Sequence, residues 1–199
     1  MKFIIVRHAE TTDNKQGIIQ GHRDPNLSSQ GKLQAQKLAQ RLKSEKIDEI
    51  YTSDLTRCKE TAAAIAVFHP SVKIHNAPLL RERNHGEFEG KKQDEISKEN
   101  YEKFFHTLEQ RPKGGESWID VGKRAEKFIQ GLHTSDKTVL LVTHGGTIIG
   151  LLCLLTNTPA KQASKFFVQG NTCVNIVEVA EDKSHKVHVL NCTKHLKID

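Results

Sequence analysis

Two short apolar runs, far apart in the chain, each lead directly into a histidine. Residues 3–6 (Phe-Ile-Ile-Val) precede Arg7-His8, and residues 139–142 (Val-Leu-Leu-Val) precede Thr143-His144. Runs of this length without a polar residue are typical of strands buried on both faces of a parallel sheet. Open α/β sheets bind ligands at the carboxyl ends of their strands, so both histidines are expected at a functional edge. For either histidine alone, a surface or helix-capping role is the ordinary alternative.

The remainder of the first half alternates between strand and helix patterns. A helix is expected from about Ser28, which is its candidate cap, after a polar loop over residues 11–27. An alanine-rich helix capped by Ser53 or Asp54 is expected next. The patterns lie in this order: strand 47–52, helix 55–67 and strand 72–77. This alternation predicts a parallel sheet with helices on both faces.

The second half adds an excursion and an edge hairpin. Residues 91–116 are highly charged, contain Pro112 and Gly114-Gly115, and predict a partly helical excursion across one end of the sheet. The later patterns are an amphipathic helix over 118–132, a strand over 138–143, an apolar helix over 145–155, and antiparallel strands at 174–179 and 187–190. We therefore predict one α/β domain over residues 1–199: a three-layer αβα sandwich with a mostly parallel sheet of about six strands, an antiparallel edge, and a helical excursion over the active site.

Charge and aromatic content narrow the choice of partner. The 199 residues carry a formal net charge of +6, but basic residues such as Lys43, Lys123 and Arg124 are scattered along the chain. Positive charge favours anionic ligands in general. Aromatic residues make up 6% of the chain, too few to suggest stacking platforms for single-stranded nucleic acid. We expect an acidic small-molecule substrate and no nucleic acid.

The lengths of the apolar runs and the spacing of the cysteines indicate the compartment in which the protein works. No run is long enough to cross a membrane, so no membrane partner is expected. Cys58, Cys153, Cys173 and Cys192 lie far apart without CxxC spacing, which argues against a disulfide framework and against a zinc site. A reducing, cytoplasmic compartment is the expectation. The oligomeric state is left open, with a homodimer as the alternative to a monomer.

An arginine and an acid complete the candidate chemistry. Arg57 falls in the first turn of the helix after the second strand, where the helix dipole favours an anion. A guanidinium there can hold two phosphate oxygens, although a solvated surface arginine is the ordinary alternative. Glu82 follows the third strand and suits a general acid. An ion pair with Arg81 or Arg83 stays open for that carboxylate.

Together these side chains predict phosphoryl transfer through a covalent histidine. Neutral imidazole is a competent nucleophile at pH 7. Two guanidinium groups and a second imidazole neutralise phosphoryl oxygens, so neither a metal nor a cofactor is expected. Gly145 and Gly146 let backbone amides at a helix start approach an anion. The acid favours an enzyme over a non-catalytic anion-binding module, because binding alone does not need it.

These motifs resemble the histidine phosphatase superfamily, also called the phosphoglycerate mutase-like family, over nearly the whole chain. The family's Arg-His-Gly-Glu signature appears as Arg7-His8-Ala9-Glu10, followed by Asn14 and Gln20-Gly21. Further matching stretches lie at 24–31, 52–62, 81–91, 114–117 and 142–146. The departure is Ala9 in place of glycine, whose methyl group is expected to crowd the pocket slightly without inactivating it.

The resemblance implies a role for each matching residue. It makes His8 the nucleophile and Glu82 the proton donor. The phosphate pocket is implied to consist of Arg7, Arg57 and His144, with Asn14, Gln20, Gly21 and Gly145 lining it. His85 and the closing residues 191–196 resemble features of phosphoserine phosphatases in the family.

The family contains phosphatases and mutases. Residues 82–118 form a compact segment and the chain ends soon after the last strand, which resembles the short phosphatases rather than the cofactor-dependent phosphoglycerate mutases. We expect a phosphomonoesterase for small phosphorylated metabolites, with the mutase as alternative and phosphoserine or sugar bisphosphates among the substrates. Lys91, Lys92 and Lys113 suit either a second anionic group or, more simply, a solvated face.

Overall fold

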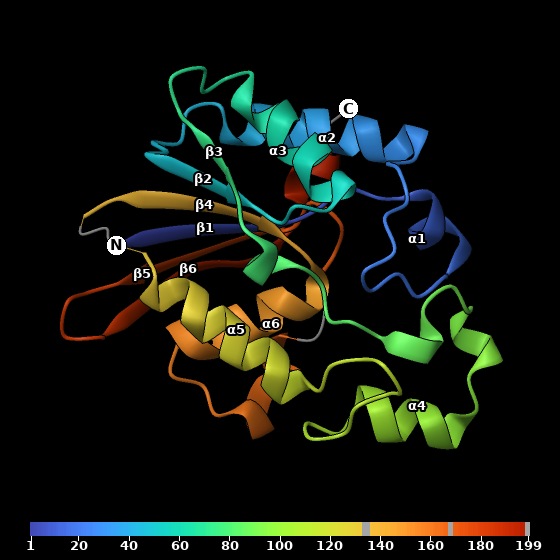
Figure 1. Ribbon diagram of the computed structural model, residues 1–199. Coiled ribbons are helices and arrows are strands. Elements are labelled where there is room, and N and C mark those ends of the chain that lie inside the picture. Colours follow the sequence, from blue (N-terminus) through green and yellow to red (C-terminus); the bar gives the residue numbers. More distant parts are fainter. Residues whose placement is uncertain (133–135, 167–168, 198–199) are drawn as a thin grey trace.

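The fold is built on a mixed sheet, seen in a computed structural model that describes residues 1–132, 136–166 and 169–197 (Figure 1). The described strands form a six-stranded sheet in the order β3-β2-β4-β1-β5-β6. The strands are β1 (Lys2–Arg7), β2 (Glu49–Thr52), β3 (Ile74–Asn76), β4 (Thr138–Thr143), β5 (Val174–Val179) and β6 (His185–Cys192). The α-helices are α1 (Thr12–Gln16), α2 (Ser29–Leu42), α3 (Thr56–Ala66), α4 (Lys98–Phe105), α5 (Trp118–Gln130) and α6 (Gly145–Leu155).

Helices cover both faces of the sheet, as the alternation predicted. In Figure 1, α2 and α3 lie on one face and α5 and α6 on the other. The central strands supply both cores by alternating side chains: Ile4 of β1 packs with the α2–α3 side, whereas Phe3 and Ile5 pack with the α5–α6 side. The predicted three-layer αβα sandwich is confirmed.

Strand pairing brings the two histidines together. β1 and β4 are parallel neighbours with Arg7 opposite Thr143, so His8 and His144 follow at the same level of the sheet. The backbone N–H of His8 donates to the Thr143 carbonyl at 2.9 Å. On the other side of β1, the antiparallel pair β5 and β6 closes the edge, which confirms the expected hairpin.

Two local predictions were wrong. The loop over residues 11–27 contains α1, because Thr11 and Asn14 form a reciprocal capping box and Gly17 ends the helix at φ 68°. Neither Ser53 nor Asp54 caps α3. Asp24, distant in sequence, accepts hydrogen bonds from the Thr56 N–H and hydroxyl, both at 2.7 Å. The predicted cap of α2 is confirmed: the Ser28 hydroxyl accepts from the Gly31 N–H.

The charged excursion lies beyond the carboxyl ends of the parallel strands. It contains α4 and a 3₁₀ turn at Gln93–Glu95, and Figure 1 places α4 apart from the helices that cover the sheet. Further 3₁₀ segments span Pro78–Leu80, Gly86–Phe88, Ala160–Phe166 and Lys194–Lys197. Among the described residues no helix combines the length and the apolar character that a membrane span needs.

Candidate active site

A cavity of about 370 Å³ lies at the carboxyl edge of the sheet. Its described lining combines the strand-end residues with loop and α4 side chains. The lining residues are Arg7, His8, Asn14, Ile18, Ile19, Gln20, Gly21, Arg57, Glu82, His85, Tyr101, Phe105, His106, Trp118, Gly145, Gly146, Ile149 and Gln169. The structure therefore gathers nine of the ten predicted site residues around one space, and His144 is the exception.

His8 is held as a neutral imidazole with one free nitrogen. Its Nδ1 lies 2.7 Å from the Ala9 carbonyl oxygen. Because a carbonyl only accepts, Nδ1 carries the hydrogen, and Nε2 keeps its lone pair. Burial, followed by the charges of Arg57 and Arg7, holds the pKa of His8 well below its usual range. The ring therefore presents an unprotonated nitrogen to the cavity at neutral pH.

Two guanidinium groups, that of the buried Arg57 and that of the half-buried Arg7, supply positive charge beside His8. Arg57 is fully buried, and its Nη1 and Nη2 donate to the carbonyls of Arg23 and Gly21 at 2.6 and 2.8 Å. Arg7 donates from Nη1 to the Gln169 carbonyl at 2.6 Å, while its buried Nε has no hydrogen-bond partner in the structure. These partners are carbonyls rather than carboxylates, so the charges are not neutralised locally. An anion in the cavity is the natural partner for them.

His144 lies directly beside His8, although it is not among the residues that line the cavity. The ring is fully buried and meets His8 edge-on, with ring centroids 5.1 Å apart. Arg57 Nε donates to its Nδ1 at 3.2 Å, and its Nε2 lies 2.8 Å from the Ser53 hydroxyl. Both nitrogens are thus engaged by protein groups. His144 is thus held in contact with both Arg57 and His8.

Glu82 reaches the cavity from the loop after β3. Its Oε1 accepts from the Arg83 N–H at 2.8 Å, and its Oε2 accepts from the Gly146 N–H at 3.1 Å. The ion-pair alternative does not hold here: Arg81 pairs with Asp54, and Arg83 donates to the Glu116 and Gln110 carbonyls. The carboxyl group is therefore fixed by backbone amides and faces the same space as His8.

The remaining predicted residues line the cavity near the two arginines. Gln20 is buried and its Oε1 has no hydrogen-bond partner in the structure. Asn14 lines the cavity from α1, while the Gly21 carbonyl holds Arg57. Gly145 begins α6, and its backbone lies against the Arg7 side chain. The N-terminus of α6 thus lies beside the Arg7 side chain, where a helix dipole favours an anion.

The opposite side of the cavity is aromatic and apolar. His85 stacks on Phe105, with ring centroids 5.1 Å apart, and burial lowers its pKa to about 4. Tyr101 and Phe105 of α4, together with His106 just after it, line this side, so the predicted excursion over the site is confirmed. The described lining contains none of Lys91, Lys92 or Lys113.

Several lining residues were not predicted from the sequence. Ile18 and Ile19 form an apolar pair within a polar loop, which was an available signal. Trp118 is the first residue of the predicted amphipathic helix over 118–132; it borders the cavity and donates from Nε1 to the Phe105 carbonyl at 2.9 Å. Ala9 is buried against Leu27 and Ala35, so its methyl group does not crowd the cavity.

Comparison with known proteins matches the whole fold. The model of the histidine phosphatase superfamily (branch 1) covers residues 3–193. The chain belongs to the histidine phosphatase superfamily. This membership confirms the predicted family and the phosphatase class of enzyme.

Individual members of the superfamily resemble this histidine phosphatase over most of its length. A probable phosphatase of Schizosaccharomyces pombe is 33% identical, over 99% of this chain and 96% of the relative. A metal-independent phosphoserine phosphatase of Arabidopsis thaliana is 34% identical, over 92% of this chain and 78% of the relative. The solved structure of Bacillus stearothermophilus YhfR superposes with a TM-score of 0.89 at 30% identity, covering 98% of each chain.

Proposed function

We propose that this histidine phosphatase is a metal-independent phosphomonoesterase that forms a phosphohistidine at His8 while hydrolysing small phosphorylated metabolites. The observation that carries the proposal is the state of His8. Its Nε2 is unprotonated, and the guanidinium groups of Arg7 and Arg57, which have no carboxylate partners, lie beside it. That arrangement combines a nucleophile with an anion-binding site and needs no metal to balance the charge of a phosphoryl group.

The first half-reaction transfers the phosphoryl group to the enzyme. The lone pair of His8 Nε2 forms a P–N bond while the P–O bond to the leaving group breaks. Glu82 gives its proton to the departing oxygen, so an alcohol leaves and Glu82 becomes a carboxylate. Arg7 and Arg57 hold the oxygens of the phosphoryl group, and His144 keeps Arg57 in place through its hydrogen bond.

The second half-reaction releases phosphate. Water attacks the phosphorus as the P–N bond breaks, and the electron pair returns to His8 Nε2. The Glu82 carboxylate accepts a proton from that water and is reset as an acid. Gln20, with its unpartnered Oε1, offers a further polar contact at the phosphate end.

The aromatic side of the cavity favours substrates in which the phosphate group is the only anionic group that the site needs to bind. Arg7 and Arg57 are the arginines in the described lining; its other basic side chains are imidazoles, of which His85 has its pKa lowered to about 4 by burial and His106 contacts the Glu102 carboxylate. A second phosphate or carboxylate on the leaving group would meet Tyr101, Phe105 and Trp118 instead of a fixed charge. This favours substrates with a single phosphate group over sugar bisphosphates. The mutase alternative, which handles a substrate with two acidic groups, is not favoured.

Location and assembly complete the proposal. The four cysteines are free thiols, and Cys58 and Cys173 are buried, as expected of a protein in a reducing compartment. A cytoplasmic location, no nucleic-acid partner, and one domain over residues 1–199 belong to the proposal. A homodimer remains the alternative to a monomer.

The test is a phosphate-release screen with chelator present, using 4-nitrophenyl phosphate, phosphoserine, phosphoglycerates and a sugar bisphosphate. His8→Ala should abolish both phosphate release and an acid-labile phosphoenzyme. Glu82→Gln should slow turnover by about 10²–10⁴-fold while inorganic phosphate still binds. Turnover by the His8→Ala protein, or activity that disappears with chelator, contradicts the proposal.

A further inference from the structure

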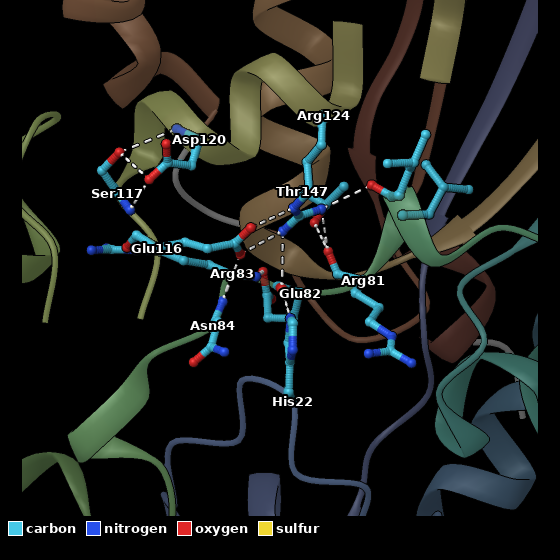
Figure 2. A network of polar contacts seen from close by, with 12 residues as sticks. His22, Arg81, Glu82, Arg83, Asn84, Glu116, Ser117, Asp120, Arg124 and Thr147 are labelled. Carbon is cyan, nitrogen blue, oxygen red and sulfur yellow. Dashed lines mark hydrogen bonds and ion pairs between the residues drawn. The ribbon is translucent and has the colours of Figure 1, made fainter. Parts of the chain in front are cut away.

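The backbone that carries Glu82 is held by one arginine from a different helix. Arg124, in the middle of α5, donates from Nη1 to the carbonyls of Leu79 and Arg81 at 2.9 and 2.8 Å. Its Nη2 donates to the carbonyl of Glu82 itself at 3.0 Å. Figure 2 shows Arg124 reaching from α5 to this segment. A single guanidinium thus holds three carbonyls within four successive residues.

The same guanidinium is locked on its other edge by Glu116. Arg124 Nε and Nη2 donate to the two carboxylate oxygens of Glu116 at 2.9 and 3.0 Å. All five N–H groups of Arg124 are therefore used, which fixes both its position and its plane. The side chains are 14% and 23% exposed, so the pair is largely removed from water.

Glu116 also holds the chain on the far side of Glu82. Its Oε2 accepts from the N–H of Asn84 at 2.9 Å. Arg124 and Glu116 therefore hold the backbone on both sides of the acid, at Arg81 just before it and at Asn84 two residues after it. Figure 2 shows Glu82 between these contacts. The Glu82 carboxyl group bonds to the backbone N–H groups of Arg83 and Gly146 and to neither of these side chains, so the pair controls the position of Glu82 without sharing its proton.

Neighbouring side chains complete the grip on this segment. Thr143 and Thr147 donate from their hydroxyls to the carbonyls of Leu80 and Arg81 at 2.7 and 2.6 Å. His22 Nε2 lies 2.9 Å from the Glu82 carbonyl and donates to it. Every carbonyl from residue 79 to residue 82 thus accepts a side-chain hydrogen bond. A surface loop usually gives such groups to water.

We propose that Arg124, locked by Glu116, is a positioning residue that sets the place of the Glu82 acid relative to His8. The inference rests on the proposed function, in which Glu82 protonates the leaving oxygen. Proton transfer requires donor and acceptor within hydrogen-bond reach, so a small displacement of the loop weakens acid catalysis specifically. Binding of the phosphoryl group by Arg7 and Arg57 does not depend on this contact.

Two substrates of similar shape distinguish a displaced Glu82 acid from a general loss of protein stability. Benzyl phosphate releases an alkoxide, which needs a proton, whereas 4-nitrophenyl phosphate releases a stabilised phenolate that leaves without one. The comparison uses kcat/KM, which reports the first phosphoryl transfer. Arg124→Lys keeps the charge but loses the planar fork. We expect a drop of about tenfold or more with benzyl phosphate and less than about threefold with 4-nitrophenyl phosphate.

Three further variants sharpen the test. Glu116→Gln should shift the ratio of the two kcat/KM values in the same direction. Arg41→Lys is the matched control, because Arg41 also pairs with a glutamate, Glu45, but lies on α2 away from the cavity. It should leave both substrates unchanged. In a Glu82→Gln background, Arg124→Lys should add no further loss with benzyl phosphate, because the acid is already absent.

The outcomes distinguish this inference from the function on which it rests. Equal losses with both substrates, or a full additional loss in the Glu82→Gln background, contradict positioning of the acid. Thermal unfolding of each variant identifies a protein that fails to fold, and Glu116→Gln then decides the question. Absence of a phosphohistidine in the wild-type protein would overturn the proposed function instead.

Discussion

Replacing Gly146 with alanine tests whether the position of Glu82 governs the chemistry. Gly146 is the second residue of α6, and its N–H donates to Glu82 Oε2. An alanine Cβ at this position would lie 2.5 Å from Glu82 Oε1 and 2.9 Å from Cζ3 of Trp118. Ordinary contacts between such atoms are about 3.4 Å or longer. The carboxyl group must therefore move by roughly 1 Å, or the indole ring must give way.

The expected cost in stability is modest and the cost in activity is large. Overpacking of this kind costs about 1–3 kcal/mol, and the alanine returns up to about 1 kcal/mol through helix propensity. A net loss of about 2 kcal/mol leaves a domain with the usual stability of about 5–15 kcal/mol folded. A displacement of about 1 Å in a reacting group can cost on the order of 10²-fold in rate. We expect kcat/KM for benzyl phosphate to fall by about 10- to 100-fold.

Gly150→Ala is the matched control in the same helix. There the nearest heavy atom to the added Cβ is the Gly122 Cα at 3.7 Å, an ordinary van der Waals contact. This variant should keep its activity and gain up to about 1 kcal/mol of stability. The assay is steady-state kinetics with urea unfolding on the same preparations. A folded Gly146→Ala protein with wild-type kcat/KM on benzyl phosphate would refute the reasoning.

Two further predictions concern stability. Burial holds the pKa values of His8, His144 and His85 below the usual range. Below about pH 6.5 the unfolded chain therefore binds protons at these histidines that the folded chain does not bind. The free energy of unfolding should fall by about 1 kcal/mol per histidine between about pH 6.5 and 5.5. Urea unfolding at both pH values checks this, and His85→Gln should remove about one third of that fall; an unchanged fall would contradict its share. Asp24→Ala should lower the free energy of unfolding by about 1 kcal/mol, because it removes the cap of α3, whereas Asp24→Asn should lower it less. Equal stability of the wild-type protein and both variants in thermal unfolding would show that the cap is unimportant.

Local pattern in the sequence determined the layers of the fold and the meeting of the two histidines. Buried strands, amphipathic helices and short caps such as Ser28 depend on residues within a few positions of one another. The parallel pairing of β1 with β4 then places His8 and His144 at one level, because each histidine directly follows its strand. Residue types and spacing were therefore enough to identify the nucleophile, the arginines and the acid as candidates.

Tertiary structure alone decided how those groups are held. Arg124 appeared in the sequence as one of several scattered basic residues, yet it is largely buried with all five N–H groups engaged. The fully buried His144 contacts Arg57 and the Ser53 hydroxyl, and neither contact follows from the sequence pattern. Asp24 caps a helix that begins 32 residues later. Each of these contacts joins segments far apart in the chain. Which residues meet in these contacts depends on how helices and loops pack, and a local sequence pattern does not show which distant segments will pack together.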